Sequence, residues 1–342
     1  METKQVSTEH KDVCKTFLKL SEMLVANKDQ WKNWAQQAKQ YNAWFTEESV
    51  ENSLQGILEM LNINDLEKLF YRYNFHNANK KVGVIMAGNI PLVGFHDFMC
   101  ILLSGNLVYA KVSSQDPFLI KKIAQMLEEI NPVFKNKIFF VEKLNDVDAI
   151  IATGSDNSAK HFIHYFSHIP HIIRKNRSSI GILNGLESNE DFINLGKDIF
   201  TYYGLGCRNI SKLYVPKGYS WNKFFEGIQI YEHIGNHHKY QNNYSYNKSV
   251  YLINSVIHLD NGFILLTENS NEIISPLGVI FFEEYNTIHD LDNQITKYQE
   301  KLQVVVSKQA WYPKSVPFGK AQFPNIDDFA DNVDTLEFLA KI

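Results

Sequence analysis

The sequence of 342 residues has little cysteine and no marked excess of charge of either sign. Its three cysteines, Cys14, Cys100 and Cys207, are scattered, and no two of them form a CxxC pair. A disulfide framework and a zinc ribbon both need paired cysteines, so neither is expected, and a reducing compartment fits best. The formal net charge of −4 provides no general basic surface for nucleic acid or anionic lipid.

Long apolar segments are also lacking. The longest nearly uncharged run, residues 82–110, is interrupted by glycines, Pro91 and Asp97, which is typical of a buried α/β core rather than a membrane span. Residues 1–12 are polar and show no secretory signal. We therefore expect a cytoplasmic protein, with Arg174, Lys175 and Arg177 as a local cationic cluster for an acidic substrate.

Two common nucleotide-binding motifs are missing as well. Residues 204–206, Gly-Leu-Gly, lack the third glycine of GxGxxG and precede an expected strand instead of following one. Gly88 is followed by Asn89 rather than by the lysine of a Walker A motif. A standard Rossmann dehydrogenase and a P-loop kinase are therefore disfavoured, although a doubly wound sheet can bind a dinucleotide in another way.

Histidines recur at a spacing that resembles a metal site, but their companions are missing. No cysteine or second ligand cluster accompanies them, and Pro170 separates the last one from the expected helix. A polar helix face with a loop histidine is the favoured interpretation, and no metal is predicted. The four residues are His161, His164, His168 and His171.

What is present is an alternation of apolar runs and helical patterns. Residues 11–70 show helical spacing, and Thr46 before Glu47 and Glu48 predicts a capped helix start. From residue 80 onward, short strands alternate with helices, which predicts a doubly wound, mostly parallel sheet. Strands are expected at 82–87, 107–112, 137–141, 148–152, 179–183, 211–215, 250–253, 263–267 and 277–282, and helices at 95–103, 117–130, 158–166 and 191–203.

Small polar loops follow three of these strands, at Gly88-Asn89, residues 111–114 and residues 153–155. Sheets of this kind bind ligands beyond the carboxyl ends of their strands. We expect an N-terminal helical segment at 1–75, a nucleotide-binding domain at 76–178, a catalytic domain at 179–310 and a closing segment at 311–342.

Cys207 stands out among the cysteines. It follows two glycines, which allow close approach of a substrate to the backbone, and Arg208 follows as a cation that favours the thiolate. A backbone N–H at this point can also serve an oxyanion. The context alone leaves open that Cys207 is a small buried apolar residue. Cys14 and Cys100 lie in apolar helical patterns and are assigned to the core.

Three motifs in a fixed order carry a resemblance to a known family. They are residues 87–94 (Ala-Gly-Asn-Ile-Pro-Leu-Val-Gly), residues 173–179 (Ile-Arg-Lys-Asn-Arg-Ser-Ser) and residues 203–209 (Tyr-Gly-Leu-Gly-Cys-Arg-Asn). The chain resembles the aldehyde dehydrogenase superfamily from about residue 42 to 339. Within it, the chain is most similar to the acyl-CoA reductase family that includes the bioluminescence fatty-acid reductase. The resemblance implies an aldehyde dehydrogenase-like fold, with a cofactor domain and a catalytic domain.

The resemblance also implies roles for individual residues. Cys207 matches the nucleophile that forms a thioester, and Asn89, before Pro91, matches the amide that holds the oxyanion together with the Cys207 N–H. The residues that match the cofactor site are Lys111 and Ser113 at the adenosine ribose, Thr153, Gly154 and Ser155 at the pyrophosphate, and Glu272 at the nicotinamide ribose. The charge of Lys111 favours NADPH, and NADH stays open. Pro317-Phe318-Gly319 resembles a motif that lines the cleft.

One departure from the superfamily bears on the reaction. Hydrolytic members carry a glutamate about 34 residues before the nucleophile, which activates the deacylating water. The corresponding position is Ile173, and residues 171–179 contain no carboxylate. An acyl group on Cys207 would then persist until CoA or a hydride removes it. His171 is the candidate for a substitute base.

The expected activity is the NAD(P)H-dependent reduction of an acyl-CoA, of the fatty acyl class, to the aldehyde through a Cys207 thioester. Three alternatives stay open: reduction of another activated acyl group such as an acyl phosphate, acyl transfer by cysteine without redox chemistry, and a binding module that has lost its chemistry. The resemblance implies a homo-oligomer, and an acyl-activating enzyme is a further expected partner.

Overall fold

The computed structural model of the chain describes residues 8–73, 75 and 79–342. The chain folds into two units: unit 1 is Met1–Asn176 with Pro324–Ile342, and unit 2 is Arg177–Phe323. Residues 311–323 thus belong to unit 2 and residues 324–342 to unit 1. The predicted assignment of separate functions to four segments stays a prediction.

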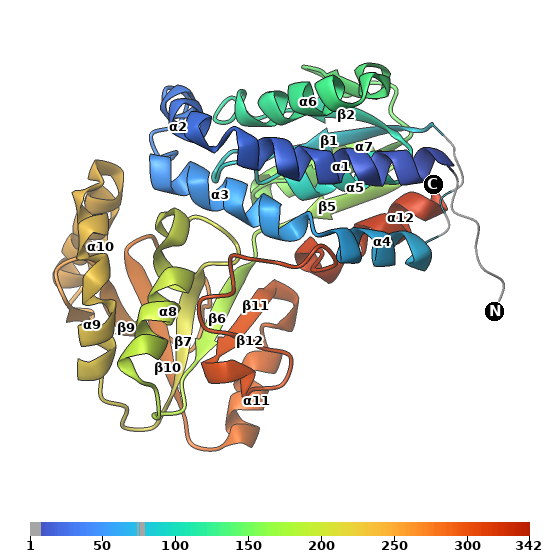
Figure 1. Cartoon of the computed structure of the whole chain (residues 1–342). Helices are drawn as coiled ribbons and strands as arrows, with labels where there is room; N and C mark the ends of the chain where they lie inside the picture. Colours follow the sequence, from blue (N-terminus) through green and yellow to red (C-terminus); the bar gives the residue numbers. More distant parts are fainter. Residues whose placement is uncertain (1–7, 74, 76–78) are drawn as a thin grey trace. The chain divides into compact units, whose positions relative to one another are not determined.

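Unit 1 begins with four helices (Figure 1). They are α1 (Thr8–Ala26), α2 (Trp31–Lys39), α3 (Glu47–Met60) and α4 (Ile63–Arg72). The predicted start of α3 is confirmed, because Thr46 Oγ1 accepts the backbone N–H of Ser49 at 3.2 Å and Glu47 and Glu48 occupy the first turn. This cap satisfies an N–H group that has no partner within the helix, and the acidic residues suit the helix dipole.

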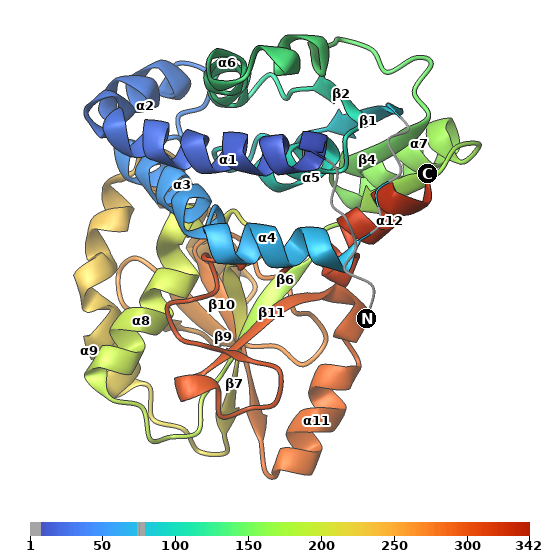
Figure 2. The same ribbon diagram turned by 45° about the vertical axis from the view of Figure 1, so that its right-hand side comes forward.

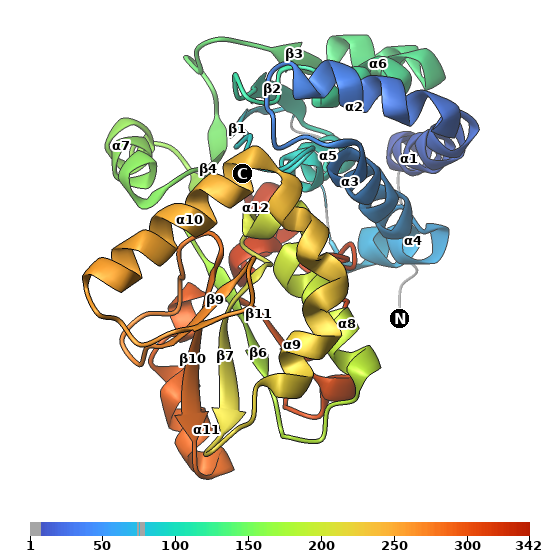
Figure 3. The ribbon, with the colours of Figure 1, turned by 90° about the vertical axis from the view of Figure 1, so that its left-hand side faces the viewer.

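A five-stranded parallel sheet with the order β3-β2-β1-β4-β5 lies in unit 1. Figure 3 shows α7 on one side of β1 and β4, and α5 and α6 on the other. The winding reverses between β1 and β4, so the doubly wound fold is confirmed. The elements are β1 (Lys81–Ile85), α5 (Phe95–Leu103), β2 (Leu107–Lys111), α6 (Leu119–Ile130), β3 (Ile138–Phe140), β4 (Ala149–Thr153), α7 (Asp156–Phe166), β5 (His171–Arg174) and the C-terminal α12 (Thr335–Lys341).

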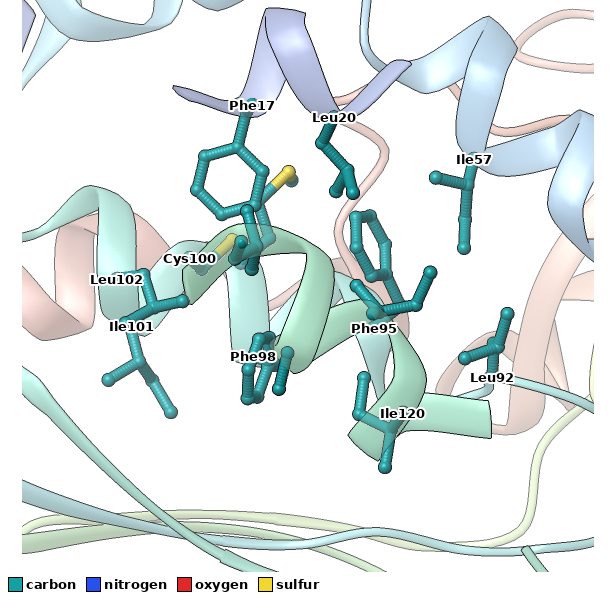
Figure 4. Close-up of a cluster of buried hydrophobic side chains, with 14 of the residues drawn as sticks. Phe17, Leu20, Ile57, Leu92, Phe95, Phe98, Cys100, Ile101, Leu102 and Ile120 are labelled. Carbon is teal, nitrogen blue, oxygen red and sulfur yellow. The ribbon is translucent and has the colours of Figure 1, made fainter. Parts of the chain in front are cut away.

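The core of unit 1 joins the first helices to the sheet. Phe17 and Leu20 of α1 and Ile57 of α3 meet the largely buried α5, whose residues include Phe95 and Phe98 (Figure 4). Helix α5 directly follows the loop after β1 and supports it. The helices that precede the sheet in the sequence therefore pack against the helix that supports this loop. Burial of each large apolar side chain contributes roughly 1.5–3 kcal/mol.

Unit 2 contains a seven-stranded sheet with the order β12-β11-β6-β7-β10-β9-β8, parallel except for β8. Figure 2 shows α8 and α9 on one side of its strands and α11 on the other. No helix in the described part of the chain is long and apolar enough to cross a membrane. The elements are β6 (Ser178–Ile182), α8 (Asn189–Phe200), β7 (Ile210–Pro216), α9 (Asn222–Ile228), α10 (His238–Ile253), β8 (Leu259–Asp260), β9 (Leu265–Glu268), β10 (Val279–Tyr285), α11 (Ile288–Thr296), β11 (Leu302–Ser307) and β12 (Val316–Pro317).

The strand predicted at residues 250–253 is wrong, because these residues form the last turn of α10. The helix buries Tyr240, Tyr244 and Asn247, which recur at helical spacing on one face. Leu252 and Ile253 are 61% and 82% exposed, so this apolar run is not buried in a sheet. A run of four apolar residues is compatible with either element, and the longer helical pattern before it decides.

Candidate active site

The carboxyl ends of three neighbouring strands of unit 1 carry the residues predicted to bind a cofactor. β1 pairs with β2 on one side, where Ile85 lies opposite Lys111, and with β4 on the other, where Ile85 lies opposite Ala152. The loops after these strands therefore begin at the same edge of the sheet. The structure brings six predicted residues to this edge: Asn89, Lys111, Ser113, Thr153, Gly154 and Ser155.

Two of these loops are in close contact. A Cβ atom at Gly88 would lie 2.5 Å from Ser113 Oγ, so a larger residue would displace Ser113. Ser113 Oγ also accepts the backbone N–H of Gln115 at 3.1 Å. The glycine thus allows the loop that carries Asn89 to approach the strand end that carries Lys111.

Helix α7 begins at the same edge, directly after the Thr153-Gly154-Ser155 turn. Ser155 is its N-cap, and the Ser155 Oγ accepts the backbone N–H of Ser158 at 3.2 Å. A Cβ at Gly154 would lie 2.8 Å from Ser158 Cβ, so the turn requires glycine. The start of a helix presents backbone N–H groups and a partial positive charge, which suit a phosphate.

The loop that carries Asn89 is anchored by side chains that sequence reasoning missed. Asn42 Nδ2 donates a hydrogen bond to the Gly88 carbonyl at 2.9 Å, and Ser53 Oγ donates one to the Pro91 carbonyl at 2.7 Å. Both side chains are buried. No sequence motif identifies Asn42 and Ser53, because their hydrogen-bond partners lie 46 and 38 residues away in the sequence.

A third anchor, Asp116, holds the end of this loop. Its carboxylate accepts the backbone N–H of Leu92 at 3.0 Å and that of Leu119 at 3.3 Å. Burial raises the pKa of Asp116 to about 6, although both hydrogen bonds oppose this shift. Leu92 itself has a φ of 56°, a conformation that side chains other than glycine seldom adopt.

His171 lies near the amino ends of the strands of this sheet, away from the carboxyl ends that carry the predicted cofactor residues. It is the first residue of β5 and pairs with Ile150, three positions before Thr153, which corresponds to about 10 Å along the strand. Its ring Nδ1 lies 2.8 Å from the Ile169 carbonyl oxygen. The structure therefore does not bring His171 together with the predicted cofactor residues, and its role as a base gains no support. Among the residues that the structure describes, no group of three or more His, Cys, Asp or Glu side chains could hold a metal ion.

The cationic cluster predicted at Arg174, Lys175 and Arg177 is wrong for Arg174. Arg174 is 3% exposed and its guanidinium pairs with Asp97 at 2.8 Å, so it is not available to a substrate. The Arg177 guanidinium donates to the Leu302 carbonyl at 3.0 Å. Two of the three cations thus bind groups of the protein, and Lys175 is the exposed member.

Cys207 is the exposed cysteine of the chain, whereas Cys14 and Cys100 are buried. The alternative that Cys207 is a small buried apolar residue is therefore wrong. Burial raises the pKa of the Cys100 thiol well above its ordinary value, which disfavours its reactive thiolate.

The turn before Cys207 has an unusual backbone. Helix α8 ends at Phe200, and Tyr202, Tyr203 and Gly204 follow with φ values of 54°, 59° and 81°. Consecutive left-handed residues cost free energy and persist only where the surroundings fix them. The turn is therefore a built feature and not the frayed end of a helix.

Asn209 supplies much of the fixation of this turn. Its Nδ2 lies within hydrogen-bonding distance of three carbonyl oxygens, those of Asp198, Ile199 and Thr201, at 3.1, 3.2 and 2.7 Å. Its Oδ1 accepts the backbone N–H of Gly206 at 2.8 Å. The end of α8 and the residue before Cys207 are thus joined through one buried side chain.

Hydrogen bonds of three further side chains fix the surroundings of Cys207. Ser179 Oγ, from β6, donates to the Cys207 carbonyl at 3.0 Å. The Arg208 guanidinium donates to the Ala321 carbonyl at 3.3 Å. The Asp198 carboxylate accepts the backbone N–H groups of Gly319 and Ala321 at 2.7 and 3.0 Å, and burial raises its pKa to about 7. The segment with Pro-Phe-Gly at 317–319 is therefore bonded to residues on both sides of residues 201–207, called here the Cys207 turn.

Glu272 is exposed in the loop between β9 and β10. Its backbone carbonyl accepts a hydrogen bond from Lys212 Nζ at 3.3 Å, and the next carbonyl, of Ile273, accepts one from Ser211 Oγ. Both donors lie at the amino end of β7, which Cys207 precedes by three residues. The structure thus brings Glu272 and Cys207 to the same edge of the sheet of unit 2.

Lys212 is a buried cation behind this loop. It is 0% exposed and pairs with Glu283 at 2.5 Å. Burial lowers the pKa of Lys212, and the hydrogen bond that Lys212 donates to the Glu283 carboxylate opposes this shift. Breaking such a pair from one side leaves an uncompensated buried charge. The same ammonium group also donates to the Glu272 carbonyl and so links the pair to this loop.

Comparisons with known proteins agree with these features. The model of the acyl-CoA reductase (LuxC) family matches residues 7–219, a range that contains Asn89 and Cys207. No curated protein matches the chain.

Solved structures of similar fold include three enzymes. Indole-3-acetaldehyde dehydrogenase AldA of P. syringae has a TM-score of 0.67 at 12% identity, over 91% of this chain and 74% of that chain. An NADP-dependent enzyme of E. coli has a TM-score of 0.65 at 13% identity, over 89% and 73%. Aldehyde dehydrogenase 21 of Physcomitrella patens has a TM-score of 0.66 at 12% identity, over 97% and 83%. At these identities the likeness shows an aldehyde dehydrogenase fold, and because the family match covers more than half of the sequence, the chain belongs to the acyl-CoA reductase (LuxC) family of oxidoreductases.

Proposed function

We propose that this protein reduces an acyl-CoA of the fatty acyl class to the aldehyde through a thioester on Cys207, with NADPH as the reductant. In this proposal unit 1 supplies most of the residues that bind the cofactor, and unit 2 supplies the nucleophile. The observation that carries it is the exposed Cys207 at the end of a fixed, left-handed turn, within the range that matches the acyl-CoA reductase family.

The edge of the sheet in unit 1 fits a dinucleotide. Lys111 is exposed at the end of β2, where an ammonium group favours the 2′-phosphate of NADPH. The capped start of α7, with the close turn at Gly154, fits the pyrophosphate. Ser113 would contact the adenosine ribose, and the exposed Glu272 of unit 2 would hold the nicotinamide ribose. When bound, NADPH supplies the hydride that converts the Cys207 thioester to the aldehyde.

The residues of the chain carry out the acyl transfer. The Cys207 thiolate attacks the carbonyl carbon of the acyl-CoA, and a new carbon–sulfur bond forms. The Asn89 amide and the Cys207 backbone N–H donate to the oxyanion that develops. The bond to the CoA sulfur then breaks, and CoA leaves as a thiolate that takes a proton from water. Reduction later breaks the Cys207–acyl bond and regenerates the thiolate.

The missing carboxylate at residues 171–179 supports reduction over hydrolysis. Without a carboxylate in this segment to act as a general base, water attacks the thioester slowly, so that CoA and hydride compete well. His171 lies near the amino ends of the strands of its sheet, away from the predicted cofactor residues at the carboxyl ends.

Replacement of the nucleophile tests the proposal. We expect Cys207→Ala to lower acyl-CoA-dependent NADPH oxidation by at least about 10⁴-fold, because no covalent intermediate can form. NADPH binding, measured by nicotinamide fluorescence, should stay within about twofold, because the residues proposed to hold the cofactor are unchanged. Cys14→Ala is the matched control, since that cysteine is buried and should keep full activity.

Three results would overturn parts of the proposal. Undiminished reductase activity in Cys207→Ala would remove the thioester. Acylation of Cys207 without any NADPH binding would favour a cysteine acyltransferase. Oxidation of NADPH with an acyl phosphate and not with an acyl-CoA would show that the substrate is an acyl phosphate.

Self-association and an acyl-activating partner enzyme remain predictions of the same proposal. Light scattering at several protein concentrations measures self-association.

A further inference from the structure

The loop of residues 88–92, called here the Asn89 loop, is fixed from outside at both ends. The Gly88 carbonyl, one residue before Asn89, accepts the hydrogen bond from Asn42. The Pro91 carbonyl, two residues after it, accepts the hydrogen bond from Ser53. Asn89 thus lies between two anchored peptide groups.

The loop also has a conformation that needs such support. The φ of 56° at Leu92 places a branched side chain in the left-handed region. Its N–H is held by Asp116, and its side chain is buried among residues of α3, α5 and α6 (Figure 4). A hydrogen bond on the backbone and an apolar anchor on the side chain together fix the end of the loop.

These anchors come from segments outside the loop. Asn42 precedes α3, Ser53 lies within α3, and Asp116 lies in the connection between β2 and α6. All three side chains are buried, at 5%, 9% and 6% exposure, so water competes little for these hydrogen bonds.

We propose that Asn42, Ser53 and Asp116 are positioning residues, which hold the Asn89 loop so that the Asn89 amide meets the developing oxyanion. The inference rests on the proposed function and adds residues that act through Asn89. A preorganised donor is effective only within a narrow geometry, and a displacement of about 1 Å can cost about 100-fold in rate. The N-terminal helices of unit 1 would therefore contribute to catalysis through the placement of one amide group.

The test compares two reactions of Cys207 in the full chain. Acylation by an acyl-CoA passes through an oxyanion, whereas alkylation by iodoacetamide displaces iodide and forms none. Rapid-quench intact mass spectrometry measures the rate of both. A positioning role slows acylation alone, whereas general disruption slows both reactions.

The first variant is Ser53→Ala, with Ser49→Ala as its matched control. Both serines are buried on the same face of α3, but Ser49 bonds to Thr46 and not to the Asn89 loop. We expect Ser53→Ala to slow acylation about 10-fold, less than the loss of an oxyanion donor, and to leave alkylation unchanged. Ser49→Ala should change neither rate.

The second variant is Asn42→Asp. It keeps the side-chain oxygen that accepts the Trp44 N–H and replaces the donor to Gly88. Asn131→Asp is its control, because the Asn131 amide also donates at a distance, to Thr16 Oγ1, but not to the Asn89 loop. Only Asn42→Asp should slow acylation, and again alkylation should stay constant.

A double-mutant cycle separates positioning from an independent effect. Asn89→Ala alone should slow acylation about 100-fold, as for loss of one oxyanion donor. Added to it, Ser53→Ala should slow acylation by no more than about twofold, since no amide is left to position. A full further loss in the double variant, or equal effects of Ser53→Ala and Ser49→Ala, would overturn the positioning role alone. A wild-type protein that no acyl-CoA acylates would overturn the proposed function itself.

Discussion

The Asn89 loop of unit 1, at Leu92, and the Cys207 turn of unit 2, at Tyr202, Tyr203 and Gly204, both contain left-handed residues, but they are fixed by different means. The Cys207 turn depends on Asn209, which lies two residues from the nucleophile and bonds to three carbonyl groups. The Asn89 loop depends on three side chains from other segments, between 24 and 46 residues away from their partners.

This difference shows where each unit is vulnerable. The Cys207 turn has most of its side-chain hydrogen bonds from one residue, Asn209, so that one substitution should disturb it. The Asn89 loop shares its support between α3, the chain before α3 and the chain after β2. It should tolerate the loss of any single anchor better, while it responds to changes far away in the sequence.

The largest effect is expected at the concentrated support. Asn209→Ala removes the partner of three carbonyl oxygens and of one N–H, and should lower the free energy of unfolding by about 3 kcal/mol. Urea denaturation measures the change. Asn254→Ala is the control in the same unit, because its exposed amide donates to a helix carbonyl, and its change should stay within about 0.5 kcal/mol. Equal losses of unfolding free energy in the two variants would contradict the view that the Cys207 turn depends on Asn209.

A smaller effect is expected from pH, through the buried aspartates Asp198 and Asp116. Burial raises the pKa of Asp198 to about 7 and that of Asp116 to about 6, so the folded protein binds each proton more tightly than the unfolded chain does. The stability that this adds is complete below the unfolded pKa of about 3.9 and is lost as the pH rises through the folded pKa. Each group contributes a slope of at most about 1.4 kcal/mol per pH unit.

Variants at the two aspartates separate their contributions. Asp198→Asn should remove the decline in stability between about pH 6 and 7, whereas Asp116→Asn should leave that part unchanged and reduce the decline below about pH 6. Urea denaturation across pH 4 to about 8 measures both. A wild-type stability that rises from about pH 5 to 7, or a decline that survives in both variants, would contradict this assignment.

The sequence indicates much of the fold because the pattern is local. The strand predicted at residues 82–87 and the cap at Thr46 are read from neighbouring residues; the strand is found at Lys81–Ile85, and the cap is confirmed. The motif around Cys207 likewise includes its main support, Asn209. The predicted ligand edge of unit 1 follows from the winding of the strands, and six predicted residues lie there.

The remainder depends on tertiary contacts that no local pattern reveals. The apolar residues 250–253 resemble a strand until the buried face of α10 is known. Arg174 resembles a substrate contact until its partner Asp97, 77 residues away, is known. Asn42, Ser53 and Asp116 are ordinary polar residues in the sequence. Asp198 could have been noticed in the sequence, because it is a carboxylate among the apolar positions of a predicted helix, next to Ile199.

The most direct measurement follows the acyl group on Cys207 itself. The protein is acylated with an acyl-CoA, freed of CoA by gel filtration and mixed rapidly with NADPH, and intact mass and NADPH absorbance are recorded together. The acyl mass on Cys207 should disappear at the rate of NADPH oxidation, with one aldehyde formed per NADPH consumed. An acyl group that persists in the presence of bound NADPH, or that leaves as a free acid without NADPH oxidation, would contradict the proposed function.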